Sequence, residues 1–376
     1  MFVQTPQKVF LVLCEEQNWD NAVLKLGLSQ NMLNAEIKKL EKSIGTLLID
    51  RTNKEKVTLT GAGKLYLQNL KHIYLKKIKS DENCAEKSCG NKEEYSMQKI
   101  YLWDDEKIKT AADRPSITFF SAGENPAPAV LVIPGGGYGN VCESTEGSPI
   151  ARKFNEIGYH AFVLDYRTAP EYSFPAPQLD AMRAMKIIRA GSKKWRIEPR
   201  RVYSCGFSAG AHLAGSLGII CDDLKFPVND EYDEFSHVPD AMILCYGVLA
   251  FEDWSHMGTQ MNLLGELPLE ERRKYSLAAN VGEKTPPAFV WHTICDQVVP
   301  FRNSIEFANA MAEFKRPCEL ALFYWGDHGM LSGTDTLDVS GWMMQADAFL
   351  KSLSLAESDP AFRERYTNKY QSAVQH

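Results

Sequence analysis

The spacing of apolar residues changes once along the 376-residue chain, near residue 98. Before that point, apolar side chains recur every three or four positions, as in helices that bury one face. After it, short β-type apolar runs alternate with helical segments. The pattern predicts a small helical domain at 1–79 and a larger domain at 99–354. A polar, charged stretch at 80–98 is expected to link the two domains, and 355–376 to form a polar tail.

Eight apolar runs of the larger domain are expected to be strands, at 99–103, 116–121, 129–133, 161–164, 201–205, 241–246, 288–292 and 319–324. From the third run onward, helices separate most of the strands, at 149–157, 178–194, 209–220, 303–314 and 339–353. This alternation favours a mostly parallel sheet with helices on both faces, so the expected fold class is α/β. The two leading runs lack a helix between them, which predicts an antiparallel pair at one edge of the eight-stranded sheet.

A long segment between the sixth and seventh strands, 249–283, is rich in Trp, Met and Leu. An insertion at this point is expected over the carboxyl edge of the sheet, where the sites of such folds lie. We therefore expect a lid that covers a small site, or a segment that is simply packed down by the same side chains, which are Trp254, Met257, Met261 and Leu263.

Composition narrows the class of protein. Hydrophobic residues make up 44% of the chain and charged residues 24%, which is ordinary for a globular protein. No run approaches the roughly 20 apolar residues that span a bilayer, and the first residues do not resemble a signal peptide, so no membrane partner is expected. Nine scattered cysteines without a C-x-x-C pair indicate reduced thiols, a cytoplasmic protein and no metal site.

Charge is distributed unevenly. Residues 1–80 hold 13 Lys and Arg against 7 Asp and Glu, so this part carries +6 although the whole chain carries −6. A basic first domain on an acidic second domain is expected where one end of a protein meets a polyanion. A solvated, lysine-rich helix face would give the same imbalance, and both interpretations stay open at this point.

A candidate nucleophile lies in the sequence Gly206-Phe207-Ser208-Ala209-Gly210, between the fifth expected strand and an alanine-rich helix. This is the context of a nucleophile elbow, in which a sharp turn from strand to helix exposes a serine hydroxyl at the tip of the sheet. The two glycines remove the side chains that would collide in such a turn. Ser208 is therefore the expected nucleophile.

The glycine run Gly135-Gly136-Gly137, at the end of the third expected strand, supplies free backbone N–H groups. Together with the N–H of Ala209, those of Gly136 and Gly137 are expected to form an oxyanion hole. A phosphate cradle is less consistent with the sequence, because no G-K-[ST] follows and the spacing does not fit a dinucleotide fingerprint. Tyr138 and Trp254 are the side chains expected to contact the substrate.

Asp296 follows the seventh expected strand and His328 follows the eighth. The order serine, acid, histidine is that of α/β hydrolases. His328 would take the Ser208 proton, and Asp296 would fix the imidazole tautomer. Asp327 is a poorer acid because sequence neighbours seldom face one another across a ring, and His292, within a strand, is expected to be a packed core residue. No cofactor is expected.

Four motifs carry a resemblance to a known family: PGGGY, GFSAGAHLA, TPPAFVWHTICDQVVP and FYWGDHGM. Together they resemble the acetyl-esterase and acetylxylan/feruloyl-esterase-like branch of the α/β hydrolases, over roughly 98–354. The resemblance implies an α/β-hydrolase fold, an ester substrate and oxyanion glycines at Gly136 and Gly137. Pro134 stands where esterases of the hormone-sensitive-lipase type have His, which argues against that branch, and Ala211 stands where many relatives have a third glycine.

The first domain predicts helices at 6–16 and 19–26 and a third helix that begins after the N-cap Ser29 and ends at Ile44. Leu33, Ile37 and Leu40 would face inward. The outer face of the third helix, where a recognition helix reads base edges, carries Asn31, Asn34 and Lys38. Wing strands are expected at 46–50 and 56–60. A last helix at 61–79 carries an apolar stripe suited to pairing two copies, made of Leu67, Leu70, Tyr74 and Ile78.

The stretch SQNMLNAEIKKLEKSIGTLLIDRTNKEKVTLTGAG resembles the winged helix-turn-helix of LysR-type regulators. The resemblance implies binding of double-stranded DNA by a homodimer. The family's usual Ser-Pro-Ala-Leu-Ser run is replaced by Asn31-Met32-Leu33-Asn34, the outer face is less basic than usual, and the hydrolase replaces the usual effector domain. A module that has lost DNA binding and is kept for dimerisation is therefore an open alternative.

The expected function is that of a cytoplasmic serine carboxylesterase. It would hydrolyse small acyl esters, chiefly acetyl esters of carbohydrate-type molecules, through an acyl-enzyme. The alternative function is a LysR-like transcription regulator whose hydrolase domain senses or destroys its inducer. A catalytically inactive hydrolase fold that only binds a ligand is a third hypothesis.

Overall fold

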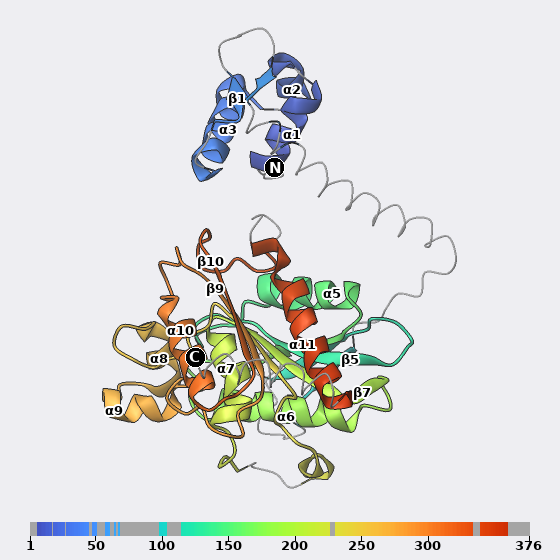
Figure 1. Ribbon diagram of the computed structural model, residues 1–376, viewed down its shortest axis with the longest axis vertical. Helices are drawn as coiled ribbons and strands as arrows, with labels where there is room; N and C mark the ends of the chain where they lie inside the picture. The colour runs from blue at the N-terminus through green and yellow to red at the C-terminus, as the bar shows by residue number, and fades with distance from the viewer. Residues whose placement is uncertain are drawn as a thin grey trace, which may run out of the picture. The chain divides into compact units, whose positions relative to one another are not determined.

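The computed structural model describes residues 6–16, 18–26, 28–44, 47–50, 57–60, 64, 67, 98–103, 114–225, 230–333 and 339–359 (Figure 1). The chain divides into two compact units, residues 1–94 and 95–376. The linker expected at 80–98 lies outside the described residues except for Gln98, which begins a strand. Each unit is described by itself below.

The first unit contains three helices and a two-stranded antiparallel sheet, with bounds α1 (Pro6–Glu16), α2 (Trp19–Leu26), α3 (Gln30–Ile44), β1 (Ile49–Asp50) and β2 (Thr58–Leu59). The inward face expected for α3 is confirmed, because Leu33, Ile37 and Leu40 are buried in the core of this unit. The Ser29 hydroxyl accepts the N–H of Met32 at 3.3 Å, as an N-cap does.

The wing strands are shorter than expected, with two residue pairs, Ile49 with Leu59 and Asp50 with Thr58. The start of β1 is fixed by Glu41 of α3, whose buried carboxylate accepts the N–H groups of Leu48 and Ile49 at 2.9 and 3.0 Å. Of the helix expected at 61–79, only residues 64 and 67 are described, so Leu70, Tyr74 and Ile78 lie outside the described residues. Leu67 packs partly buried against the core of the unit.

The second unit is built on an eight-stranded sheet, and its architecture confirms the expected α/β-hydrolase fold. The strands are β3 (Gln98–Tyr101), β4 (Ser116–Phe120), β5 (Ala127–Ile133), β6 (His160–Asp165), β7 (Ile197–Phe207), β8 (Met242–Cys245), β9 (Ala288–Thr293) and β10 (Cys318–Phe323). Their order across the sheet is β10-β9-β8-β7-β5-β6-β4-β3. β3 and β4 pair antiparallel at one edge, and all pairings from β5 to β10 are parallel.

Helices cover both faces of the sheet (Figure 1). One face carries α5 (Ser148–Glu156) and α11 (Trp342–Ser358), and the other carries α6 (Ala176–Ala190), α7 (Ala209–Ile219) and α10 (Arg302–Glu313). The sequence of β5 explains why both faces are dry, because Leu131 and Ile133 enter one core while Val130 and Val132 enter the other. α11 ends at Ser358, beyond the expected end at 353, so the tail begins later than predicted.

The segment 249–283 contains α8 (Met257–Leu264), α9 (Leu269–Arg272) and a 3₁₀ turn, η4 (Arg273–Tyr275). It is part of the core rather than a detachable lid, because Leu249, Phe251, Leu263 and Leu277 are fully buried. Leu263 is therefore a core residue and not a lid surface. Three further short turns lie among the described residues of this unit, η2 (Glu143–Gly147), η3 (Glu231–Glu234) and η5 (Val339–Gly341). Within the described ranges, no helix is both long and apolar enough to cross a membrane.

Candidate active site

Ser208 stands in the turn between β7 and α7 with a backbone φ of 53° and ψ of −119°. A positive φ is strained for a residue with a side chain, and such strain collects at functional turns. The turn is closed so tightly that a Cβ on Gly206 would strike the backbone of Gly210, and one on Gly210 would strike the carbonyl of Ile133. The two glycines are therefore required by close backbone contact.

A chain of hydrogen bonds joins Ser208, His328 and Asp296. The Ser208 Oγ lies 2.8 Å from His328 Nε2, and His328 Nδ1 lies 2.7 Å from Asp296 Oδ2. Because Nδ1 faces a carboxylate, it carries the ring proton, which leaves Nε2 free to accept the hydroxyl proton of Ser208. Asp327, the weaker candidate for the acid, is exposed to solvent.

The Asp296 carboxylate is held on both oxygens. Its Oδ1 accepts the N–H groups of Val298 and Val299 at 2.8 and 2.9 Å. Burial works to raise the pKa of Asp296, but hydrogen bonds from His292 and His328 outweigh it, and the pKa lies well below its usual range. The Asp296 carboxylate is therefore ionised and held in place by its hydrogen bonds.

His292 is a core residue with a second contact that the sequence did not indicate. It is fully buried, and its Nδ1 lies 2.8 Å from the Ser304 hydroxyl. Its Nε2 lies 3.0 Å from the Val299 carbonyl and 3.3 Å from Asp296 Oδ2. The ring therefore also steadies the loop that presents Asp296.

The three amides expected to form the oxyanion hole lie in the glycine loop and at the first residue of α7. Gly136 and Gly137 adopt positive φ values of 123° and 64°, and the Gly136 carbonyl accepts the N–H of Gly139 at 3.0 Å. Within the described part of the hydrolase unit, no protein acceptor takes the N–H of Gly136, Gly137 or Ala209. The Ser208 N–H, by contrast, is occupied by the Cys245 carbonyl at 3.0 Å. The three open amides are thus available to an incoming oxyanion.

Tyr138 does not take the role expected from the sequence. Its side chain is 1% exposed, and its hydroxyl lies 2.8 Å from His212 Nδ1 on α7. His212 Nε2 in turn donates to the Tyr275 carbonyl at 2.8 Å. Burial lowers the pKa of His212 to about 4, so the ring is neutral. This burial contradicts the expected substrate contact and makes Tyr138 an anchor of the glycine loop.

Glu146, on η2, was not singled out from the sequence but contacts the glycine loop. It is 6% exposed, and its Oε2 accepts the Gly135 N–H at 2.7 Å. Its Oε1 accepts the Tyr246 hydroxyl at 2.9 Å. No local signal in Glu143-Ser144-Thr145-Glu146-Gly147 separates this buried glutamate from the exposed Glu143.

Helix α8 of the 249–283 segment lies against the glycine loop. The Asn262 side-chain amide donates to the Gly137 carbonyl at 2.8 Å, and His256 caps the helix by accepting the Thr259 N–H at 3.2 Å. Burial lowers the pKa of His256, and the charge of His328 acts in the same direction. Met257 and Met261 of α8 are exposed, so they are not packed down into the core of the unit.

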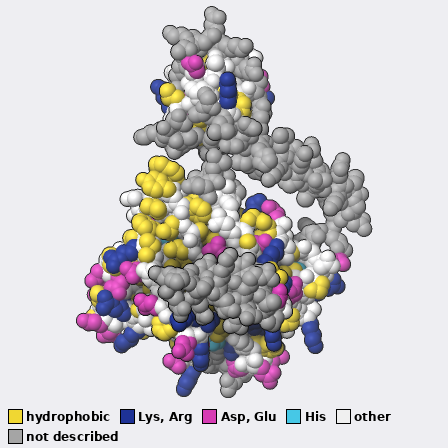
Figure 2. Space-filling view, in the orientation of Figure 1, with side chains coloured by type: hydrophobic (Ala, Val, Ile, Leu, Met, Phe, Trp, Pro, Cys, Tyr) yellow, Lys and Arg dark blue, Asp and Glu magenta, His cyan; other side chains and the backbone are white. Residues whose placement is uncertain are grey.

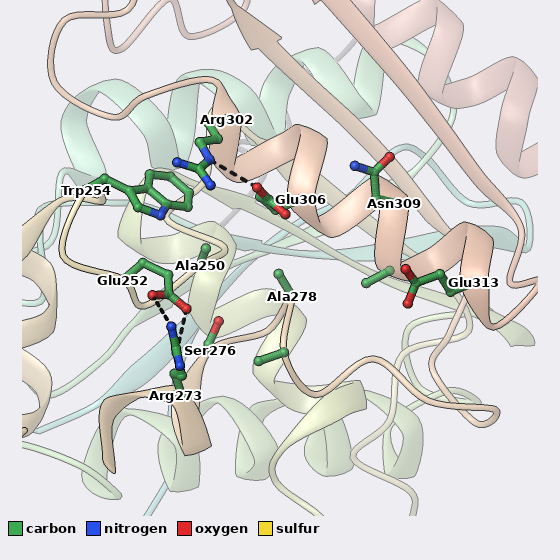
Figure 3. A pocket seen from close by; sticks show the side chains of 12 residues that line it. Ala250, Glu252, Trp254, Arg273, Ser276, Ala278, Arg302, Glu306, Asn309 and Glu313 are labelled. Atoms are coloured by element: carbon green, nitrogen blue, oxygen red, sulfur yellow. Dashed lines mark hydrogen bonds and ion pairs between the residues drawn. The ribbon is translucent and has the colours of Figure 1, made fainter. Parts of the chain in front are cut away.

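Trp254, by contrast, lines a different cavity of about 450 Å³ beside α10 (Figure 3). The Arg302 guanidinium lies 4.3 Å from the centre of the Trp254 ring, and ion pairs join Arg302 to Glu306 and Arg273 to Glu252. Ser208, Asp296 and His328 do not line this cavity. The cavity beside Trp254 therefore gives no support to the expected contact between Trp254 and a substrate.

Exposed apolar side chains gather on the hydrolase unit where β9 and β10 end (Figure 2). Tyr324 and Trp325, which follow β10, are 55% and 63% exposed, and their rings meet edge to face at 4.6 Å. They precede His328 by four and three residues, yet the motif around His328 gave no reason to expect a role for them.

On the first unit, the exposure expected on the outer face of α3 is found at two of its three residues. Asn31 and Lys38 are exposed, whereas Asn34 is partly buried and donates its side-chain amide to the Gln30 carbonyl at 3.1 Å. Lys39 is paired with Glu36 at 2.7 Å. The helix therefore presents one free amide and one lysine outward without competing ion pairs at Lys38 within the described residues.

Comparison with known proteins gives two family matches. The BD-FAE family matches residues 117–311, and the family described as bacterial regulatory helix-turn-helix protein, lysR family, matches residues 7–64. The chain is 42% identical over 217 residues to endo-1,4-beta-xylanase B of Butyrivibrio fibrisolvens, covering 57% of this chain and 34% of that protein. It is 30% identical over 249 residues to an acetylxylan esterase of Xylanibacter ruminicola, covering 64% and 48%.

The chain therefore spans about a third to a half of the length of these curated relatives. Among solved structures, the acetyl ester-xyloside bifunctional hydrolase from Caldicellulosiruptor lactoaceticus matches with a TM-score of 0.64 and 37% identity, covering 68% of this chain and 96% of that one. Both resemblances predicted from the motifs are confirmed. Because the first family match spans more than half of the chain, the protein belongs to the BD-FAE family of α/β hydrolases, and it carries a LysR-type helix-turn-helix domain ahead of the hydrolase.

Proposed function

We propose that the protein is a serine carboxylesterase that removes small acyl groups, chiefly acetyl, from carbohydrate-type esters. The observation that carries the proposal is the hydrogen-bonded chain from Ser208 through His328 to Asp296, set beside three unoccupied backbone amides. A nucleophile, a base that is oriented by an acid, and donors for an oxyanion are the groups that acyl transfer needs.

In the proposed mechanism, Ser208 Oγ attacks the ester carbonyl carbon while His328 Nε2 takes the hydroxyl proton. The carbonyl oxygen becomes an anion that the N–H groups of Gly136, Gly137 and Ala209 stabilise. When the tetrahedral intermediate collapses, the C–O bond to the alcohol breaks and His328 returns the proton to the leaving alkoxide. Water then attacks the acyl-enzyme with the same proton route, releasing the carboxylic acid and restoring Ser208.

Asp296 stabilises the imidazolium of His328 in both halves of this cycle. Since Asp296 is buried and already holds four hydrogen-bonding partners, it needs no reorganisation when that charge forms. The fixed acid favours catalysis over a role as a passive ligand sensor.

The substrate class is supported by position and by relatives. α8 approaches the glycine loop, because the Asn262 side-chain amide donates to the Gly137 carbonyl. We expect this approach to leave less room for a long acyl chain beside Gly137. Relatives named as an acetylxylan esterase and as an acetyl ester-xyloside hydrolase support acetylated sugars as the substrate. The exposed rings of Tyr324 and Trp325 precede His328 by four and three residues in the sequence, and we expect them to offer apolar faces to the alcohol part of the ester.

The test compares hydrolysis of aryl acetate, aryl butyrate and acetylated xylo-oligosaccharide by the full chain and by Ser208→Ala. We expect the wild type to prefer acetyl and the variant to lose at least about 1,000-fold in kcat, leaving only the small rate that the oxyanion hole and binding provide. A variant with near-normal kcat would show that Ser208 is not the nucleophile. Turnover of octanoyl esters faster than acetyl esters would defeat the acyl assignment.

A second function is favoured by the match of residues 7–64 to the LysR family and by the exposed outer face of α3. We propose that this domain binds double-stranded DNA as a homodimer and that the protein is a cytoplasmic regulator as well as an esterase. Asn31 and Asn34 would contact base edges and Lys38 a phosphate. The two functions are compatible, because the hydrolase domain would then destroy the small acylated inducer to which the regulator responds.

A further inference from the structure

Glu146 is a buried carboxylate that the proposed mechanism does not use. It lies in the π-turn η2, between β5 and α5. Among the described residues, no Lys or Arg pairs with it. Burying a carboxylate without a cation is costly, so such a group is retained where its hydrogen bonds are worth more than its hydration.

On one side Glu146 holds the glycine loop. Its Oε2 accepts the Gly135 N–H at 2.7 Å, immediately before Gly136. Gly135 is so enclosed that a Cβ there would lie 2.9 Å from this oxygen and 3.0 Å from the Cβ of Ser208. The carboxylate therefore fixes how far the glycine loop stands from the nucleophile.

On the other side Glu146 holds the loop that carries His328. Its Oε1 accepts the Tyr246 hydroxyl at 2.9 Å, and that hydroxyl accepts the Leu331 N–H at 3.3 Å. The Tyr246 ring meets the His328 ring edge to face, with centres 5.1 Å apart. A chain of contacts thus runs from Gly135 through Glu146 and Tyr246 to the His328 ring and to Leu331, three residues after it.

The surroundings of Glu146 suit an ionised carboxylate that acts only as an acceptor. Burial raises the pKa of Glu146, while the hydrogen bonds from Gly135 and Tyr246 and the charge of His328 act in the opposite direction. The other titratable groups whose pKa Glu146 raises are the thiols of Cys142 and Cys245 and the phenols of Tyr166 and Tyr246, all of which are neutral. The nearest charge that can form during the reaction is therefore that of His328.

We propose that Glu146 is a positioning residue that keeps the oxyanion loop and the His328 loop in register around Ser208, through Gly135 on one side and Tyr246 on the other. The proposal rests on the esterase function proposed above. It predicts that Glu146 affects the rate of acyl transfer far more than it affects substrate binding, because the groups it aligns meet the substrate most strongly in the transition state.

The test uses Glu146→Gln, Tyr246→Phe and the double variant in the full chain. The readouts are kcat and KM for aryl acetate, the rate at which a fluorophosphonate labels Ser208, and the thermal midpoint. A glutamine at position 146 keeps one acceptor oxygen but turns an N–H toward either the Gly135 N–H or the Tyr246 hydroxyl, so one of the two hydrogen bonds is lost. We therefore expect kcat and the labelling rate to fall about 100-fold, while KM stays within about threefold. Tyr246→Phe keeps the ring and should lose about tenfold. The kcat of the double variant should lie within about threefold of that of Glu146→Gln, because both substitutions interrupt the same chain of contacts.

Glu156→Gln is the matched control, since Glu156 is exposed on α5 and pairs with Lys153 at the surface, and its kcat should equal that of the wild type. Near-normal kcat and labelling in Glu146→Gln, or losses in the double variant that multiply, would overturn the proposal. A loss of kcat in Glu146→Gln that is fully explained by the fraction of unfolded protein would also overturn it. If Glu146→Gln does not fold, an unchanged kcat in Tyr246→Phe would overturn the proposal. A wild type that neither turns over esters nor is labelled at Ser208 defeats the esterase function itself, which the other outcomes leave standing.

Discussion

At the scale of single residues, the geometry distinguishes two aspartates near His328: Asp296, which is close to it in space, and Asp327, which precedes it in the sequence. Asp296 is buried and makes its hydrogen bond to His328 Nδ1, while Asp327 is exposed although it is the immediate neighbour of His328. An asparagine at position 296 would present His328 Nδ1 with one of two groups. A neutral amide oxygen cannot stabilise the positive charge of the imidazolium as a carboxylate does, and an amide N–H forces His328 into the wrong tautomer.

Asp296→Asn should therefore lower kcat by about 10⁴-fold, and Asp327→Asn by less than about tenfold. The measurement is the steady-state hydrolysis of an aryl acetate by the two variants, together with their thermal midpoints. Asp327→Asn serves as the matched control because it makes the same chemical change one residue from His328. Equal losses in the two variants would reverse the assignment of the acid.

His212 gives the hydrolase unit a pH-dependent stability. Burial lowers its pKa in the folded protein to about 4, against an ordinary value of 6.5. As the pH falls below 6.5, the unfolded chain takes up a proton that the folded protein refuses, so the free energy of unfolding decreases, by about 3 kcal/mol at pH 4. Above about pH 7.5 neither state binds a proton at His212, so the residue no longer makes the free energy of unfolding depend on pH.

Urea unfolding of the full chain at pH 7, 5.5 and 4.5, followed through the hydrolase transition, measures this slope. His212→Asn should be less stable at pH 7, because the bonds to Tyr138 and Tyr275 are lost, yet lose less stability on acidification than the wild type. The other buried histidines contribute equally to both proteins and cancel in the difference. Parallel curves for the two proteins would show that His212 is not the group that titrates.

The residues of the proposed triad could be named from sequence because each one stands in a short motif at a strand end, where the fold must place it at one edge of the sheet. The residues that contact and support the proposed triad could not be named from the sequence. Glu146 contacts Gly135 and Tyr246, which lie 11 and 100 positions away. Tyr138 follows the glycines directly, but its positive φ of 58° turns the side chain inward toward His212.

At the scale of elements, the strands were predictable because short continuous apolar runs, separated by helical segments, are typical of a sheet that is covered on both faces. The arrangement of buried and exposed residues within the 249–283 segment was not predictable. Its Trp, Met and Leu content suits a lid or a core equally, and only the packing shows that Leu263 and Leu277 are core while Met257 and Met261 are exposed. The role of the segment at the site therefore rests on α8.

Asn262→Ala tests that role without disturbing the core, because Asn262 is exposed and its side-chain amide donates to the Gly137 carbonyl. Loss of this bond frees the glycine loop from α8, so we expect the preference for acetyl over butyryl esters to shrink about three- to tenfold, with the thermal midpoint unchanged. The measurement is the ratio of kcat/KM for the two aryl esters. Glu266→Ala, exposed just after α8, is the control, and an unchanged ratio in Asn262→Ala would remove α8 from acyl selection.

At the scale of the whole molecule, the chain joins two units of opposite charge. Residues 1–80 carry more lysine and arginine than aspartate and glutamate, while the chain as a whole is acidic. An acidic hydrolase would be repelled by DNA, so attraction must come from the first unit alone. We therefore expect the two proposed activities to be separable by cutting the chain between the units.

DNA binding, if it is retained, should belong to a dimer, since one recognition helix offers few base contacts, and two copies would read half-sites about one helical turn apart. Full-length protein should then bind promoter DNA with an affinity that falls steeply with salt, whereas residues 80–376 alone should not. Asn31→Ala should relax specificity more than affinity, and Lys38→Ala should lower affinity on all sequences and reduce the salt slope by about one. Lys39→Ala is the matched control for Lys38, because Lys39 is already paired with Glu36. Equal, weak binding by both proteins with one salt slope would leave the first unit as a dimerisation module on an esterase.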